Sequence, residues 1–132
     1  MDHSSVAVLF VDCDMPYAAW LESVLLRTGT DRYSFMHVTS LSAALEELDR
    51  GEVRLIMMSL SLSDAAGLPA LARMRASARG APIVVLGARY HEETAMRAVR
   101  EGAEDYLVKG DVSEQAMLRI VRYTAERVRV ER

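Results

Sequence analysis

Acidic and thiol side chains directly follow the first apolar run of this 132-residue sequence, where they are well placed for chemistry. The run Val6–Val11 leads into Asp12, Cys13 and Asp14. Two carboxylates at this spacing suit a hard divalent cation such as Mg²⁺, which takes oxygen ligands and keeps several of its waters. Spacing alone favours a simpler interpretation, in which Asp14 caps a helix and Asp12 is a solvated acid, because turns after buried strands commonly contain Asp.

Chemistry at this position requires other chain segments to end beside it. Short, continuously apolar runs alternate with longer stretches of helical spacing, and each run comes first in its pair. Continuous apolarity is typical of strands buried on both faces, as in a parallel sheet covered by helices. The predicted strands are Val6–Val11, Tyr33–Val38, Val53–Ser59, Pro82–Gly87 and Asp105–Val108. Strict alternation predicts five strand-helix units in a three-layer α/β domain with right-handed crossovers.

Each predicted helix has an apolar stripe at helical spacing. The stripes are Leu21, Val24, Leu25 and Thr28; Leu41, Ala44, Leu45 and Leu48; Leu68, Leu71, Ala72 and Arg75; Ala95, Ala98, Val99 and Gly102; and Met117, Ile120, Val121, Thr124, Ala125 and Val128. Gly29, Gly51, Gly80 and Gly102 each follow a helix, where glycine permits the left-handed conformation that commonly ends one. Asp111 and Glu114 have capping-box spacing and are expected to start the last helix.

Composition limits the class of protein. About half of the residues are apolar and 27% are charged, which fits one domain over 1–132. The single cysteine fits a reducing cytoplasm, and neither a signal sequence nor a membrane-length apolar run is present. A net charge of −3 favours a protein partner and argues against nucleic acid and membrane as partners. The C-terminal E-R-V-R-V-E-R, residues 126–132, is consistent with the start of a helical linker to an output domain.

Four segments together resemble the receiver domain of two-component response regulators. They are LFVDCDMPYAAWLESVL, LIMMSLSLSDAAGL, PIVVLG and AVREGAEDYLVKGDVSEQAMLRIVRYTAER, which cover nearly the whole chain. The E-G-A-x-D-Y-L-V-K sequence is the most specific, because it joins a helix end, a short strand and a strand-end lysine. The resemblance implies a flavodoxin-like (βα)5 fold with parallel strand order 2-1-3-4-5, whose crevice lies where the strand order reverses.

In such receivers an aspartate at the end of the third strand accepts phosphate, and an acidic pair at the end of the first holds Mg²⁺. Three positions of this sequence depart from that pattern. Ser59 replaces the acceptor, Cys13 replaces the second acid, and Gly87 replaces the Thr or Ser that ends the fourth strand. A serine without a general base is a poor nucleophile, and sulfur is a poor ligand for Mg²⁺. The resemblance therefore implies a degenerate phosphorylation site.

Other positions retain the family pattern. Asp12 matches the first acid, Lys109 matches the phosphate-reading lysine, and Tyr106 matches the aromatic that turns inward on activation. With no carboxylate at position 59, we expect Lys109 to pair with Asp12 or Asp14. These two acids are the residual metal candidates, and we expect Mg²⁺ to bind weakly or not at all, with no other cofactor.

Alternatives remain at the level of sequence. Ser59 or Asp64 is a candidate non-standard acceptor, although the composition around Asp64 fits an ordinary turn. A flavodoxin-like cofactor binder is disfavoured because the first loop lacks a phosphate-cradling Ser, Thr or Gly cluster. No G-x-S-x-G motif surrounds Ser59, which argues against a serine hydrolase. Cys13 is expected to be a buried, inert thiol. The sequence places none of His3, His37 and His91 as catalytic or metal-binding.

The favoured function is a phosphorylation-independent regulatory module of two-component-type signalling, not an enzyme, that acts through protein contacts. The partner is either a separate protein or a fused output domain of the histidine kinase or diguanylate cyclase type. The predicted interaction face lies on the fourth helix, the fifth strand and the fifth helix, and its charges of mixed sign allow a two-fold contact between copies. We expect a weak homodimer through the last helix. The arginines of this face are Arg97, Arg100, Arg119 and Arg122.

Overall fold

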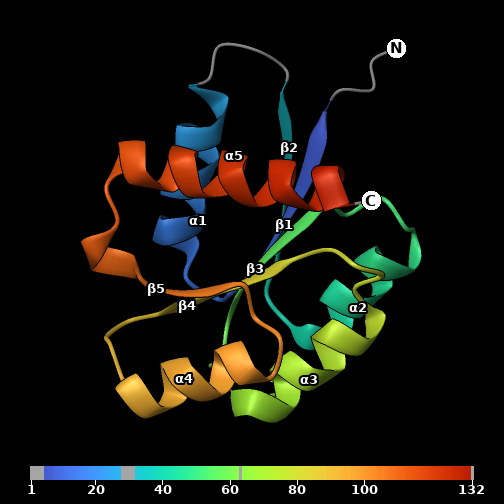
Figure 1. Cartoon of the computed structure of the whole chain (residues 1–132), viewed down its shortest axis with the longest axis vertical. Helices are drawn as coiled ribbons and strands as arrows, with labels where there is room; N and C mark the ends of the chain where they lie inside the picture. Colours follow the sequence, from blue (N-terminus) through green and yellow to red (C-terminus); the bar gives the residue numbers. More distant parts are fainter. Residues whose placement is uncertain (1–4, 28–31, 63, 132) are drawn as a thin grey trace.

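A computed structural model describes residues 5–27, 32–62 and 64–131, with the side chains of the last helix described as far as Glu126. Five strands alternate with five helices, as predicted (Figure 1). The elements are β1 (Val6–Val11), α1 (Met15–Leu26), β2 (Tyr33–Val38), α2 (Leu41–Asp49), β3 (Leu55–Ser59), α3 (Gly67–Ser77), β4 (Ile83–Gly87), α4 (Glu92–Arg100), β5 (Asp105–Val108), a 3₁₀ turn η1 (Lys109–Asp111) and α5 (Glu114–Glu131).

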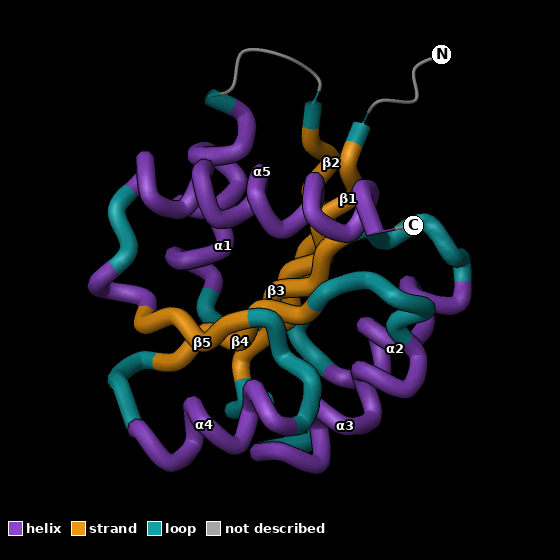
Figure 2. Tube along the Cα trace, viewed as in Figure 1, coloured by secondary structure: helices purple, strands orange, loops and turns teal. Residues whose placement is uncertain are grey.

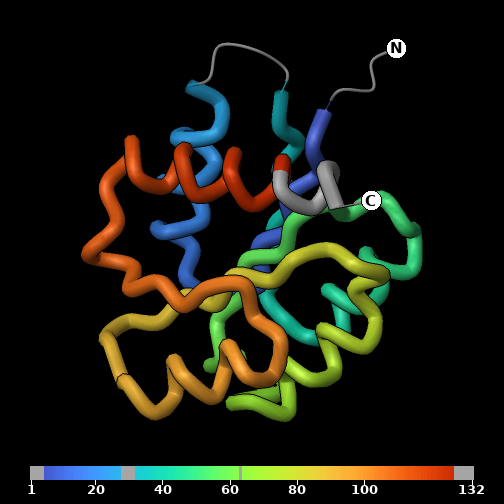
Figure 3. Tube along the Cα trace, in the orientation of Figure 1, coloured from blue at the N-terminus to red at the C-terminus, as the bar shows by residue number. Residues whose placement is uncertain are grey.

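The strands form one parallel sheet in the order β2-β1-β3-β4-β5, which confirms the predicted fold. Figure 3 shows β1 beside β3, although α1, β2 and α2 separate them in sequence. The predicted bounds of β1, β2 and β5 match the structure, whereas β3 begins at Leu55 and β4 at Ile83. Pro82 has no N–H to give to the sheet, and it takes part through its carbonyl, which accepts from the Ile56 amide at 2.9 Å.

Helices cover both faces of the sheet, so the fold has two apolar cores (Figure 2). Helices α1 and α5 pack on one face, around Phe10, Leu21 and Met117. On the other face lie α2, α3 and α4, packed around Leu9, Met58 and Met74. The central strand β3 is buried along its whole length, as its continuous apolar run predicts.

The stripe predicted for the third helix is wrong in phase. Helix α3 buries Ala70, Leu71 and Met74, while Ala72 and Arg75 are exposed. Alanines occur on several sides of this helix, so its apolar pattern is nearly uniform and does not fix which side faces the sheet. Val99 of α4 is also exposed, although it was predicted to be buried.

The predicted start of the last helix is wrong as well. Ser113 caps α5, since its hydroxyl oxygen accepts from the Ala116 amide at 3.1 Å, and Asp111 lies in the preceding turn η1. Glu114 is consequently the first helical residue, not the third. Gly51, Gly80 and Gly102 have the left-handed conformation predicted for a glycine that follows a helix. Gly29, the fourth glycine of that prediction, lies outside the described residues, as does Thr28.

Among the described residues, no helix is both long enough and apolar enough to cross a membrane.

Candidate functional site

The carboxyl ends of β1, β3, β4 and β5 surround a crevice of about 400 Å³. Residues from each of these ends line it, including Asp12, Ser59, Gly87 and Lys109, together with Tyr106. Parallel strands bring these residues together because all their carboxyl ends lie at one edge of the sheet. The crevice is thus where the sequence placed the functional site.

Lys109 forms ion pairs with two carboxylates across the mouth of this crevice. Its ammonium nitrogen Nζ lies 2.7 Å from Asp12 Oδ2 and 2.9 Å from Asp14 Oδ2. Asp12 is buried, with 4% of its surface exposed, whereas the Asp14 side chain is 36% exposed. The expected pairing of the lysine with Asp12 or Asp14 is therefore present, and it involves both acids at once.

Asp14 also caps α1, so this residue is both a helix cap and a partner of Lys109. Its Oδ1 accepts from the Tyr17 amide at 3.0 Å, which leaves Oδ2 for the lysine. The amide of Asp14 in turn donates to Asp12 Oδ1 at 3.2 Å. The helix start and the ion pairs thereby fix each other's geometry.

These contacts shift the titration of both partners. The hydrogen bond from Lys109 is the main cause that lowers the pKa of Asp14, and the Tyr17 amide adds to it. Burial lowers the pKa of Lys109, but its bonds to Asp12 and Asp14 outweigh burial, so the net pKa is raised. Both groups are therefore held in their charged forms.

Tyr17 is a crevice neighbour that the sequence did not single out. The Lys109 nitrogen lies 5.2 Å from the centre of its ring, within cation–π range. Its hydroxyl is buried without a hydrogen-bond partner among the described residues, and burial raises the pKa of Tyr17 to about 12. In the sequence, the only sign that Tyr17 would contact Lys109 is its place three residues after a helix-capping Asp.

The Cys13 thiol lies outside the crevice. It is exposed, and its sulfur donates to the carbonyl of Thr39 at 3.5 Å. The expectation of a buried thiol is wrong, because side chains alternate along an extended backbone and Asp12 takes the inward position. Cys13 accordingly contributes neither an oxygen ligand nor an inward-facing sulfur.

Ser59 is buried at the end of β3, and its hydroxyl oxygen accepts from the Ser61 amide at 3.0 Å. His91 lines the same crevice from the start of α4. His37 makes its hydrogen bond elsewhere, through Nε2 to the backbone carbonyl of Asp12 at 2.7 Å. Because a carbonyl only accepts, Nε2 carries the proton. His3 lies outside the described residues.

Comparison with known proteins identifies the family. The model of the response regulator receiver domain matches residues 8–122. The chain belongs to this family. The Escherichia coli transcriptional regulatory protein BasR is 33% identical over 100 residues, which cover 76% of this chain and 45% of BasR. The E. coli transcriptional regulatory protein ZraR is 28% identical over 109 residues, or 83% of this chain and 24% of ZraR.

Solved receivers share the fold. A CheY-like receiver domain protein from Methanospirillum hungatei has a TM-score of 0.85 at 18% identity and covers 98% of this chain and 100% of that one. A two-component response regulator from Clostridium difficile gives 0.82 at 21% identity, covering 92% and 97%. The chain spans less than half of BasR and ZraR, so it corresponds to one signalling module of those longer regulators.

Asp64 of this receiver lies apart from the crevice lining. Its two carboxylate oxygens accept from the Leu41 and Ser42 amides, at 2.9 and 3.0 Å, at the start of α2. These amides lower the pKa of Asp64, the Leu41 amide most. Asp64 therefore joins the loop after β3 to α2, in addition to the capping of that helix by Ser40.

The four arginines of the predicted interaction face lie on two helices of the receiver. Arg97 and Arg100 lie on α4, which packs beside β5. Burial raises the pKa of Tyr33 on β2, and Arg122 of α5 lies close enough to oppose this rise. Helix α5 thus extends toward β2, the edge of the sheet opposite β5. Helix α5 crosses the sheet at an angle that its sequence does not reveal.

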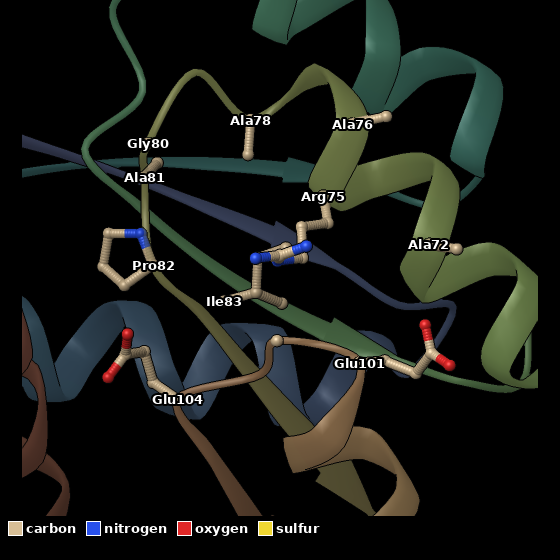
Figure 4. A pocket seen from close by; sticks show the side chains of 11 residues that line it. Ala72, Arg75, Ala76, Ala78, Gly80, Ala81, Pro82, Ile83, Glu101 and Glu104 are labelled. Atoms are coloured by element: carbon tan, nitrogen blue, oxygen red, sulfur yellow. The ribbon is translucent and has the colours of Figure 1, made fainter.

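A second cavity, of about 490 Å³, lies at the opposite end of the sheet (Figure 4). It is lined mainly by Ala, Gly and Pro residues at the end of α3 and the starts of β4 and β5. The Arg75 side chain extends into it beside Ile83, and it occupies the space where a side chain at Gly102 would lie. None of the crevice residues lines this cavity.

Proposed function

We propose that this receiver regulates through protein contacts without forming an aspartyl phosphate, and that it is not an enzyme. The observation that carries the proposal is the pair of short contacts from Lys109 to Asp12 and Asp14. An ammonium group stands where the first-strand acids of an active receiver would hold a metal ion. The ammonium thus offsets one of the two carboxylate charges from within the chain.

The donor set supports the same conclusion, because it does not fit Mg²⁺. The ion takes six oxygens in near-ideal octahedral geometry and is usually held by carboxylates. The second acid position holds Cys13, whose thiol faces Thr39, and the third-strand end holds the Ser59 hydroxyl. In the part of the chain that the structure describes, no group of three or more His, Cys, Asp or Glu side chains is placed to hold a metal ion.

The acceptor position supports it further. Ser59 can carry phosphate only as an ester, and activation would require a base bonded to its hydroxyl. The hydrogen bond that its oxygen accepts comes from the Ser61 backbone amide. Asp64, the other candidate, is held at the start of α2 by two amides. We therefore favour a phosphorylation-independent mechanism over phosphorylation of either Ser59 or Asp64.

The output of this receiver, on the same proposal, is a contact with a cytoplasmic protein partner or a fused output domain. Helix α5 continues to Glu131, and we propose that residues 126–132 begin such a connection. An exposed apolar group on α4 and the loop before it supports a protein contact. Its members are Tyr90, Met96 and Val99, which are 60%, 49% and 51% exposed.

A magnesium titration followed by amide NMR tests the proposal. We expect no shifts around Asp12 up to millimolar Mg²⁺, with or without beryllofluoride, which mimics an aspartyl phosphate. The control is the triple variant Cys13→Asp, Ser59→Asp and Gly87→Thr, in which we expect saturable Mg²⁺ shifts. Saturable shifts at Asp12 in the unmodified receiver would refute the proposal.

A further inference from the structure

Strand β2 is an edge of the sheet, and every second residue of it has backbone groups without a partner among the described residues. The Val6 amide donates to the carbonyl of Arg32 at 2.7 Å, and the Asp12 amide donates to that of Val38 at 3.0 Å. In a parallel pair such bonds recur at every second residue, so the even-numbered residues of β2 bond to β1. The residues that direct their N–H and C=O groups outward are Tyr33, Phe35 and His37.

This edge lacks the features by which natural proteins protect an exposed strand. Edge strands are commonly very short, bulged, or supplied with charged residues or Pro, which keep a second chain from pairing with them. The β2 sequence Y-S-F-M-H-V contains no Asp, Glu, Lys, Arg or Pro, and its register with β1 runs over six residues without a bulge. The opposite edge, β5, has four residues, begins with the exposed Asp105 and packs beside α4. Strand β2 is therefore the edge that is open to a further strand.

We propose that β2 pairs antiparallel with β2 of a second copy of this chain, about a two-fold axis at Phe35. This inference goes beyond the proposed function, and the crevice takes no part in it. In this register Phe35 lies opposite Phe35 of the other copy, and Tyr33 lies opposite His37. These are all hydrogen-bonded pairs, because such pairs recur at every second residue of an antiparallel ladder. It is the one antiparallel register in which every outward group of both strands has a partner.

The side chains of β2 identify a second copy as the partner, because they are symmetric about Phe35. Tyr33, Phe35 and His37 share the face that α1 and α5 cover, so aromatic rings meet aromatic rings across the seam. Such cross-strand pairs stabilise a sheet. On the other face Ser34 meets Met36 of the other copy, and no like charges are opposed. The two-fold axis is perpendicular to the sheet, so α5 of both copies lies on one side, in agreement with the dimer expected through this helix.

The test is an intermolecular nuclear Overhauser contact between the Hα atoms of Ser34 and Met36. In the proposed register these residues form a non-hydrogen-bonded pair, whose Cα atoms lie about 4.5 Å apart with their hydrogens between them. Within one strand, residues two apart are separated by about 6.5 Å, too far for a strong contact. We expect a strong cross-peak in a mixture of isotope-labelled and unlabelled receiver, at concentrations where sedimentation shows a dimer.

Amide hydrogen exchange gives a second readout that needs no variant. The amides of Ser34 and Met36, which bond to β1, should be protected at every concentration. Those of Tyr33, Phe35 and His37 should become protected as the dimer forms. Exchange at these three amides that does not slow with dimer formation would overturn the inference.

A charge placed at the seam should prevent the pairing. Ser34→Asp puts a carboxylate opposite Met36 of the other copy, and a buried charge without a partner is unfavourable. We expect this variant to sediment as a monomer at concentrations where the unmodified receiver is a dimer. Ala72→Asp is the matched control, because it adds the same charge at an exposed position of α3 and should leave the balance unchanged.

Two results would overturn the inference. One is a monomer at every concentration, and the other is a dimer without the cross-peak between Ser34 and Met36, which would place the contact on another surface. Neither result bears on the proposed function, because the Mg²⁺ titration tests that function in monomer and dimer alike.

Discussion

Asp12 is a carboxylate with 4% of its surface exposed, and its charge is balanced by the ammonium of Lys109. A buried charge without a partner is costly, because desolvation is no longer offset by an opposite charge. The sequence indicated this pairing from residue types at two strand ends. It did not indicate that Tyr17 would lie beneath the ammonium, since ring contacts depend on how α1 sits on the sheet.

Replacing the lysine should reveal how much the pair stabilises the fold. For Lys109→Met we expect a loss of roughly 3 kcal/mol in the free energy of unfolding, the low end for breaking a buried pair, because the lysine side chain is 17% exposed. Urea unfolding measures it. Adding Asp12→Asn as the matched control should recover most of the loss, since it removes the orphaned charge. A full loss that persists in the double variant would contradict this account.

The same pair predicts a pH dependence. The pKa of Asp14 in the folded state is lowered below 3.8. The charged Asp14 therefore stabilises the fold above pH 3.8, and this stabilisation is lost as the pH falls through the folded-state pKa. The pKa of Lys109 in the folded state is raised above 10.5, so the charged Lys109 stabilises the fold below pH 10.5, and this stabilisation is lost as the pH rises through the folded-state pKa. The stability difference between the unmodified receiver and Lys109→Met should be flat from about pH 5 to 9 and shrink at both extremes. An undiminished difference at pH 2 would contradict it.

Strands β1 and β3 of this receiver could be predicted from sequence because each is a continuous apolar run. Helix phase and helix starts were less predictable. Helix α3 has small residues on several sides, and the start of α5 depended on choosing between Asp111 and Ser113 as the cap. Both residues have side chains able to cap, and only the backbone path through η1 decides between them.

The capping assignment for α5 can be tested with two alanine variants. Ser113→Ala should lower the free energy of unfolding by about 1 kcal/mol, because the Ala116 amide loses its acceptor. Asp111→Ala should change it by less than about 0.5 kcal/mol, as an exposed substitution away from any cap. Urea unfolding of the pair measures both. A larger effect at Asp111 would show that the capping box operates after all.

At the scale of the whole molecule, the fold brings four strand ends into one crevice and leaves an apolar group exposed on α4. The crevice could be predicted, because strand order follows from the alternation of strands and helices together with the resemblance to receivers. The neighbours of the arginines on α5 could not, because the crossing angle of α5 decides which groups lie beside them.

The expected weak dimer through α5 can be tested by charge reversal. Arg119→Glu with Arg122→Glu should shift the receiver toward monomer, since both arginines lie on the helix expected to form the contact. The matched pair on α4, Arg97→Glu with Arg100→Glu, which flanks the exposed Met96 and Val99, should have less effect. Sedimentation velocity over a concentration series measures the balance. The opposite ranking would place the contact on α4.

We expect that the crevice does not take up phosphate. Incubation of the receiver with acetyl phosphate and Mg²⁺, followed by measurement of the intact mass under conditions that preserve acyl phosphates, tests this. We expect no added phosphoryl mass on the unmodified protein and an added phosphoryl group on the triple variant Cys13→Asp, Ser59→Asp, Gly87→Thr. A donor-dependent phosphoryl adduct on the unmodified protein, at Asp64, at Ser59 or at another residue of the crevice, would contradict this expectation.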